Sequence, residues 1–240
     1  MKPILIIRTG HAPDTIRARF GDFPLWFQRA AKLSAQRVRV INVAAGEALP
    51  AIEDAAGAII TGSGAMVTER LPWSENTAAW IREAVNDELP LFGVCYGHQL
   101  MAHALGGRVD YLPGGREVGT QAISPLPTTQ SDTLAEPAAS PFRAHTTHEQ
   151  SVLEPPTGAI TLARSAQDAH QILRYGPHAI STQFHPEFSA DIMRAYIRHK
   201  FAKCWDQAAQ EAFRAVAPAP DARQVLQRFA RQHAWTSEGR

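Results

Sequence analysis

Cysteine is scarce in this sequence, which has only Cys95 and Cys204 among its 240 residues. Their positions show no paired spacing of the kind that builds a disulfide framework or a zinc site. We therefore expect a protein of a reducing, cytoplasmic compartment.

An excess of charge is also missing, because Lys and Arg number 24 against 23 for Asp and Glu. The net charge of +1 gives no long-range attraction toward nucleic acid or an anionic membrane. The first apolar run, Met1–Ile7, is interrupted by Arg8 and His11 before a signal-peptide core is complete. No later run approaches the roughly 20 residues of a membrane span. We expect a soluble protein without a targeting segment that acts on a small molecule.

What the sequence does contain is an ordinary globular composition, with 45% hydrophobic and 20% charged residues. Short apolar runs that suit strands buried on both faces alternate with segments of helical periodicity. This alternation predicts an α/β fold with a mostly parallel central sheet flanked by helices. The expected strands are Pro3–Ile7, Arg37–Val43, Ala56–Thr61, Leu89–Val94, Ala159–Ala163, Gln171–Tyr175 and Ala179–Phe184, and the expected helices are Pro24–Lys32, Ser74–Val85, Ser189–Phe201 and Ala222–His233.

Two stretches depart from this alternation. Repeated glycines and prolines between Gly107 and about Thr147 predict a small insertion of hairpins and loops. After Lys203 the chain is rich in Ala, Arg and Gln, so we predict one domain over residues 1–202 and a helical C-terminal extension over 203–240. A packing helix is the simpler interpretation of this extension, and a basic face that contacts a partner is the alternative.

The most specific local pattern surrounds Cys95, where an apolar strand runs into Gly93-Val-Cys95-Tyr-Gly97 and then a helix that begins near Gly97. This order is typical of a nucleophile elbow, in which the nucleophile sits on a strained turn and glycines allow close approach of the chain. The helix N-terminus stabilises a thiolate and lowers the thiol pKa below about 8.5. A lone cysteine after a strand is otherwise a small buried hydrophobe, and the two glycines favour the reactive interpretation.

A second pattern is Phe184-His185-Pro186-Glu187, which follows another expected strand. Pro186 keeps the tripeptide extended, so the side chains of His185 and Glu187 point to the same side. Glu187 can then hydrogen-bond the far nitrogen of the imidazole and orient it. Alone, this string also suits an exposed turn; together with Cys95 it supplies nucleophile, base and orienting acid.

A third pattern is the small-residue loop Thr61-Gly62-Ser63-Gly64 at the end of an expected strand. A tetrahedral oxyanion needs backbone N–H donors of the kind that such a loop can present. The candidate donors are the N–H of Ser63, or alternatively Gly64, and the N–H of Tyr96. A phosphate loop is less suitable because the Lys-Ser/Thr ending is missing, and a plain turn between strand and helix remains the alternative.

Metal binding is the remaining chemical alternative. Two pairs of histidines are the candidates, His145 with His148 and His98 with His103. Neither pair comes with carboxylate or cysteine ligands at zinc spacing. We expect no metal and no cofactor.

The three patterns, in this order, resemble the class I (triad) glutamine amidotransferases, the family of the glutaminase parts of GMP synthetase, anthranilate synthase and carbamoyl-phosphate synthetase. The resemblance implies a flavodoxin-like arrangement of the predicted domain. It also implies that Cys95 attacks the side-chain amide of glutamine, that His185 transfers the proton, and that Glu187 orients His185. Ammonia then leaves, and water resolves the γ-glutamyl thioester.

The same resemblance implies a set of substrate-binding residues. Gln99 helps to hold the glutamine, and His148 lies beside the substrate and presents backbone atoms. The loop glycines Gly62 and Gly64 complete the set. The loop lacks the Gly-Pro that many members have there, so its oxyanion donor is not assigned to one residue.

Several functions remain open within this resemblance. Because 37 residues remain after Lys203, we expect no synthetase domain there, and we expect ammonia to pass to a separate synthetase subunit or to be released. Gly114–Gly119 resembles a stretch of stand-alone members, a looser group that includes plant γ-glutamyl peptidases. Hydrolysis of γ-glutamyl peptides is therefore one alternative, and a non-catalytic protein that binds a metabolite or partner is another. A homodimer also stays open.

Overall fold

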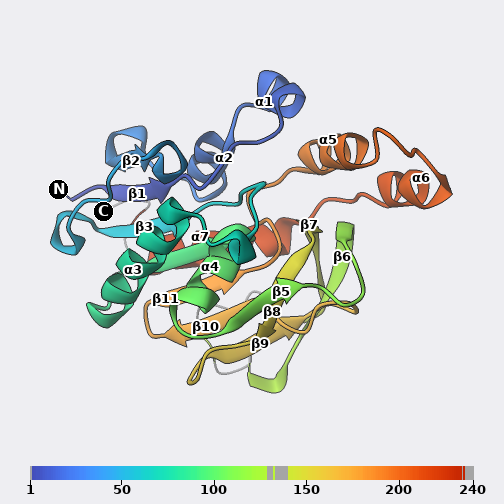
Figure 1. Ribbon diagram of the computed structural model, residues 1–240. Helices are drawn as coiled ribbons and strands as arrows, with labels where there is room; N and C mark the ends of the chain where they lie inside the picture. Colours follow the sequence, from blue (N-terminus) through green and yellow to red (C-terminus); the bar gives the residue numbers. More distant parts are fainter. Residues whose placement is uncertain (1, 129–131, 133–139, 234, 236–240) are drawn as a thin grey trace.

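The computed structural model describes residues 2–128, 132, 140–233 and 235. Its centre is a nine-stranded sheet in the order β2-β1-β3-β4-β11-β10-β9-β6-β7, and β5 and β8 form a small second sheet (Figure 1). The strands are β1 (Ile4–Ile7), β2 (Val38–Ile41), β3 (Gly57–Ile60), β4 (Leu91–Val94), β5 (Arg108–Tyr111), β6 (Glu117–Pro125), β7 (Phe142–His148), β8 (Gln150–Glu154), β9 (Ile160–Arg164), β10 (Ile172–Gly176) and β11 (Ala179–Thr182).

Helices cover both faces of this sheet. They are α1 (Asp14–Phe20), α2 (Phe23–Ala30), α3 (Pro72–Asn86), α4 (Tyr96–Ala104), α5 (Ala190–Lys200), α6 (Gln207–Arg214) and α7 (Pro220–Gln232). Short 3₁₀ turns lie at Ala35–Arg37, Val43–Ala45, Ile52–Asp54 and Val67–Glu69. No helix of the described residues has the length and apolar character that a bilayer crossing requires.

The central strands are buried on both faces, which explains their continuous apolar runs. Because side chains alternate along a strand, Ile4 and Ile6 pack into one core with α2, α5 and α7. Leu5 and Ile7 point the other way, into a second core with α3 and α4. The fold is therefore a mostly parallel central sheet between two helical layers, as the sequence predicts, and the parallel part is β2-β1-β3-β4-β11.

The sheet order brings the two chemical motifs together. β4 and β11 are parallel neighbours, with Val94 paired to Thr182, so their carboxyl ends meet at one edge. The N–H of Cys95, directly after β4, donates to the carbonyl of Thr182 at 2.9 Å. Ligands of open α/β sheets bind at the carboxyl ends of the strands. Cys95 and His185 therefore lie next to each other although 90 residues separate them.

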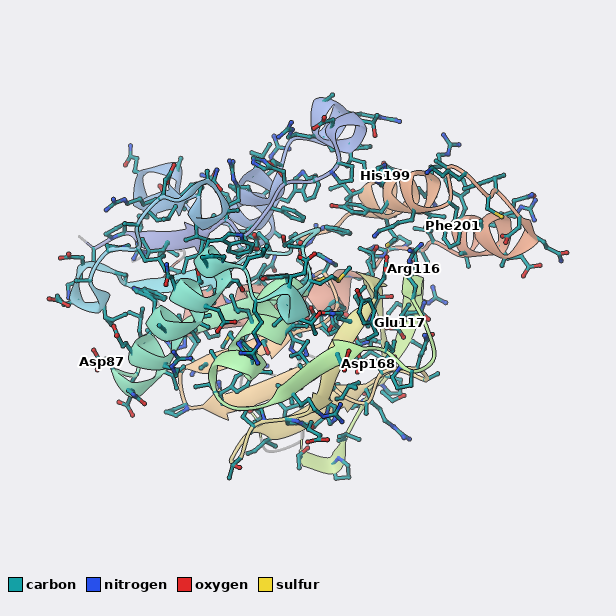
Figure 2. The ribbon with its side chains drawn as sticks, in the orientation of Figure 1. Asp87, Arg116, Glu117, Asp168, His199 and Phe201 are labelled. Atoms are coloured by element: carbon teal, nitrogen blue, oxygen red, sulfur yellow. The ribbon has the colours of Figure 1, made fainter. Side chains whose placement is uncertain are left out.

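The stretch rich in glycine and proline contains β5 and a long hairpin of β6 and β7, which extends the sheet with antiparallel strands. Residues 129–131 and 133–139 of that stretch lie outside the described residues. The start of β6 lies near the turn between β9 and β10, and Figure 2 labels Glu117 and Asp168 in these two segments. Both carboxylates lie within 4 Å of the same buried histidine, His148.

The C-terminal segment contributes to the main core. Val225, Leu226 and Phe229 of α7 are fully buried, and the ring of Phe229 lies 5.3 Å from that of Phe92 in β4, centre to centre. Trp235 packs against Gly57, where any added Cβ would meet its indole ring. α7 is thus a packing helix, whereas the division at residue 202 stays a prediction.

Candidate active site

Cys95 lies on a tight turn between β4 and α4. Its φ of 53° and ψ of −103° are unfavourable for a residue with a side chain, and such strain concentrates at functional sites. The turn is close-packed on both sides: a Cβ on Gly97 would collide with the carbonyl oxygen of Ile60, and one on Gly93 would come within 2.7 Å of the carbonyl oxygen of Gly97. Glycine is required at both positions, which is why the elbow can form here.

His185 is held by contacts on several sides and begins a turn, not the extended segment that the sequence predicts, since the N–H of Phe188 donates to the carbonyl of His185 at 3.4 Å. Its Nδ1–H donates to Oε1 of Glu187 at 2.7 Å, and both side chains are almost fully buried. Its backbone N–H donates to the carbonyl of His145 at 2.8 Å. The ring is stacked on Phe188, with centroids 4.0 Å apart, and lies nearly parallel to Phe23 at 6.5 Å. These contacts leave Nε2 as the ring nitrogen that is free to exchange a proton.

The Cys95 thiol and the His185 imidazole form an electrostatic pair. Burial alone raises the pKa of the Cys95 thiol, but the charge of His185 outweighs burial and lowers the pKa. Burial likewise disfavours the charged imidazole, and the charges of Glu187 and Cys95 reverse this and raise the pKa of His185 to about 10. The site therefore favours a thiolate beside an imidazolium.

The loop Thr61–Gly64 lies against this pair. The hydroxyl of Ser63 donates to the carbonyl of Thr9 at 2.8 Å and accepts from the N–H of Ala65, which fixes the loop to the segment that follows β1. A Cβ on Gly62 would lie 3.1 Å from Cε1 of His185, so the loop touches the imidazole. The loop residues Ser63 and Gly64 border the same cavity as Cys95.

Tyr96 occupies the first position of α4, where the N–H has no acceptor within the helix. Its side chain turns away from the site and shares a 2.7 Å hydrogen bond with the hydroxyl of Ser74. Only its backbone is thus available as an oxyanion donor. The donor roles of Ser63, Gly64 and Tyr96 stay predictions.

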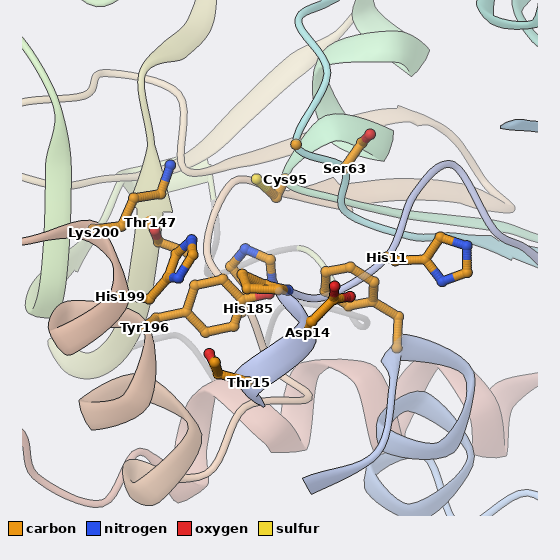
Figure 3. Close-up of a pocket in the computed structure, with 13 residues that line it drawn as sticks. His11, Asp14, Thr15, Ser63, Cys95, Thr147, His185, Tyr196, His199 and Lys200 are labelled. Atoms are coloured by element: carbon orange, nitrogen blue, oxygen red, sulfur yellow. The ribbon is translucent and has the colours of Figure 1, made fainter. Parts of the chain in front are cut away.

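Two hollows meet at Cys95. The larger is a cavity of about 530 Å³, and Figure 3 shows Cys95 and His185 between side chains of α5 on one side and of the start of α1 on the other. The smaller is a narrow hollow lined by Gln99 and His148, together with Ser63 and Gly64. Glu187 borders neither, which suits a residue that acts through His185.

The predicted substrate-binding side chains are partly engaged by the protein itself. Nε2 of Gln99 donates to the carbonyl of Gln150 at 2.6 Å and to Oε1 of Gln183 at 3.0 Å. Both ring nitrogens of His148 are hydrogen-bonded, one of them to Glu117. Their roles in substrate binding stay predictions.

Some residues of the large cavity were not predicted from the sequence. Tyr196, His199 and Lys200 of α5 and Thr147 of β7 line it. His199 and Lys200 follow Tyr196 by three and four positions, which places the three residues on one face of the helix. This spacing is the sequence signal that could have predicted that they line one cavity. The hydroxyl oxygen of Thr147 is buried and makes no hydrogen bond within the described residues.

In the histidine pairs considered as metal ligands, His148 is hydrogen-bonded to Glu117 and His103 to Glu75. Among the described residues, no group of three or more His, Cys, Asp or Glu side chains is arranged to hold a metal ion.

Comparison with known proteins identifies relatives of the same architecture. The family model described as glutamine amidotransferase class-I matches residues 27–204. The chain is 32% identical over 130 residues to one subunit of the glutamine-hydrolysing GMP synthase of Saccharolobus solfataricus, covering 54% of this chain and 65% of that relative. It is 27% identical over 144 residues to Gamma-glutamyl peptidase 4 of Arabidopsis thaliana, covering 59% of this chain and 57% of that relative. The matches thus span less than two thirds of these relatives.

A solved structure agrees over nearly the whole chain. The crystal structure of a glutamine amidotransferase from Thermotoga maritima superimposes with a TM-score of 0.74 at 18% identity, covering 97% of this chain and 98% of that one. At this identity the likeness concerns the fold.

Proposed function

The chain belongs to the class I glutamine amidotransferase family, and from this premise we propose that it hydrolyses a γ-glutamyl amide through a covalent thioester on Cys95. The observation that carries the proposal is the buried pair of Cys95 and His185, in which the imidazole is oriented by Glu187 through a 2.7 Å hydrogen bond. Nucleophile, base and orienting acid in this relation are the parts that acyl transfer requires.

The proposed reaction has two halves. The Cys95 thiolate attacks the amide carbon, and backbone N–H groups of Tyr96 and of Ser63 or Gly64 stabilise the resulting oxyanion. The His185 imidazolium donates its Nε2 proton to the departing nitrogen, and the C–N bond breaks. Water then enters, gives a proton to His185 and attacks the thioester carbon, which releases glutamate and restores the thiolate.

Glutamine is the first substrate that we propose, with ammonia as the leaving group. The name of the Saccharolobus relative describes part of a glutamine-hydrolysing synthase, which supports transfer of the ammonia to a separate synthetase chain. Release of free ammonia is the other outcome.

The size of the cavity beside Cys95 favours a second candidate, the hydrolysis of γ-glutamyl compounds with larger leaving groups. A volume of about 530 Å³ lies in the range of pockets that hold drug-sized ligands, and ammonia as leaving group needs far less. The Arabidopsis relative is named a γ-glutamyl peptidase. A protein that binds such molecules without turnover is the third candidate, and failure of a glutamine analogue to label Cys95 at neutral pH would support it.

The test is to incubate the purified protein with glutamine, glutathione and other γ-glutamyl amides and to measure the released ammonia or amine. We expect turnover of at least one substrate and a loss of at least ~10³-fold in Cys95→Ala, because the thioester cannot form. Glu187→Gln should retain more activity than His185→Ala, since the acid orients the base and transfers no proton itself. Full activity of folded Cys95→Ala contradicts the mechanism, and equal losses in the other two variants contradict the assigned roles.

A further inference from the structure

A buried histidine beside Cys95, His148 at the end of β7, has a hydrogen-bonding pattern that reveals its charge. Its Nδ1 lies 2.9 Å from the carbonyl oxygen of Gln150, and its Nε2 lies 2.8 Å from Oε2 of Glu117. A backbone carbonyl only accepts, and so does an ionised carboxylate. Both ring nitrogens must therefore carry a proton, which makes the ring of His148 an imidazolium.

Hydrogen-bond donors surround the carboxylate of Glu117. Its carboxylate accepts from the Ser165 hydroxyl at 2.6 Å and from Nε2 of Gln171 at 2.8 Å, in addition to His148. The Ser165 oxygen itself accepts the N–H of Asp168, so its own proton is free for Glu117. Three donors on one buried carboxylate stabilise its charge.

A second carboxylate reinforces the cation. Oδ2 of Asp168 lies 3.9 Å from Nε2 of His148, and it accepts a hydrogen bond from the hydroxyl of Ser151 at 2.6 Å. Glu117, Asp168 and His148 are all at most 4% exposed. A buried charge is tolerated when it is paired and hydrogen-bonded, and this cluster meets both conditions.

The imidazolium borders the narrow hollow that also contains Cys95. Resting on the function proposed above, we propose that His148 is a positioning residue whose fixed positive charge helps His185 to hold Cys95 as a thiolate. This role is separate from acid–base catalysis. Since both N–H groups of His148 are bonded to acceptors, it has no proton to exchange and stays charged while His185 cycles.

The direction of the electrostatic effects agrees with this geometry. Burial disfavours the charged form of His148, but the hydrogen bond to Glu117 and the charges of Asp168, Glu117 and Cys95 outweigh it and raise its pKa. The charge of His148 acts, after that of His185, to lower the pKa of Cys95. Several titratable and charged groups face this pair. They are Glu117 from β6, Asp168 from the β9–β10 turn, His98 from α4, His185 and Glu187 from the segment after β11, Glu149 between β7 and β8, and Tyr196 and Lys200 from α5.

The protonation of His148 can be observed directly in the unaltered protein. We expect ¹H–¹⁵N correlation spectra of ¹⁵N-histidine-labelled protein to show both ring nitrogens of His148 bonded to protons around pH 7, with the assignment made by loss of the signals in His148→Gln. A deprotonated ring nitrogen at pH 7 would overturn the proposal, because the ring would then be neutral.

The effect on Cys95 is measured by the rate of iodoacetamide alkylation against pH, with the Cys95 peptide quantified by mass spectrometry and exposed Cys204 as an internal reference. We expect Glu117→Gln and His148→Gln to slow alkylation of Cys95 roughly tenfold at pH 7 and to move its midpoint to higher pH. His98→Gln is the matched control, since His98 is equally buried but neutral, burial lowering its pKa to about 3.

Equal slowing in all three variants, or none in the first two, would overturn the proposal. Because alkylation needs no turnover, its outcome is independent of the substrate assays. In a protein without amidase activity, the rate of Cys95 alkylation can still depend on His148. In an active protein, the rate can be independent of His148.

Discussion

The imidazole of His185 lies flat on the ring of Phe188, with centroids 4.0 Å apart and planes inclined by 19°. Phe188 in turn stacks on Tyr196 of α5, with centroids 4.8 Å apart. The plane of the imidazole is therefore set by packing, and its direction within that plane is set by the hydrogen bond to Glu187. Two independent constraints orient the proposed base.

The first prediction concerns this stack. Phe188→Leu should lower kcat about tenfold with little change in KM, because a loosely held imidazole transfers protons less effectively. Phe229→Leu is the control: Phe229 is also buried in the same core, but it packs against Phe92 and Trp235. Steady-state kinetics and urea unfolding of both variants provide the measurement. If kcat falls in both variants in proportion to their loss of stability, Phe188 does not orient the imidazole of His185.

The second prediction concerns pH. The pKa of Cys95 is lowered, so the reactive thiolate persists below the usual thiol range and is lost only when pH falls through that lowered pKa. The pKa of His185 is raised to about 10, so the imidazolium that protonates the leaving group is lost when pH rises through that value. A profile of kcat/KM from pH 5 to 11 should show a broad plateau between these limits. An acid limb centred near the free-thiol pKa of about 8.5 contradicts the ion pair.

The third prediction tests the close packing of the elbow. Gly97→Ala should destabilise the protein by about 1–3 kcal/mol or more, since its Cβ collides with the carbonyl oxygen of Ile60, which is backbone and cannot turn aside. Gly64→Ala has nothing within 4 Å of the added Cβ and should unfold at nearly the same urea concentration as the parent protein. Equal stability of the two variants would contradict the close packing of Gly97 against Ile60.

The fourth prediction concerns the C-terminal segment. Phe229→Ala should cost about 3–5 kcal/mol of unfolding free energy, because the ring is fully buried against β4. Arg231→Ala, an exposed change on the same helix, should change it by less than about 0.5 kcal/mol. If Phe229→Ala instead leaves the unfolding of the sheet untouched, residues 203–240 are an independent extension.

Much of the fold was accessible from local patterns. The buried strands β1, β3 and β4 are continuous apolar runs, and α5 begins one residue after Ser189, whose side chain caps it by accepting from the N–H of Ile192. The short helices α1 and α6 were not predicted individually. α1 spans seven residues and α6 eight, which is shorter than the window of about 11–18 residues over which apolar periodicity indicates a helix.

The sequence by itself determined most of the elements and the local geometry of the elbow, because strand alternation, helical periodicity and the need for glycine at Gly93 and Gly97 act within a few residues. The conformation of His185-Pro-Glu187 was predicted wrongly, because this segment forms a turn and is not extended. Only the tertiary structure decided the meeting of Glu117 with His148 and the cavity between α1 and α5. These contacts join segments far apart in the chain, and their distances depend on the order of strands in the sheet, which no local pattern encodes.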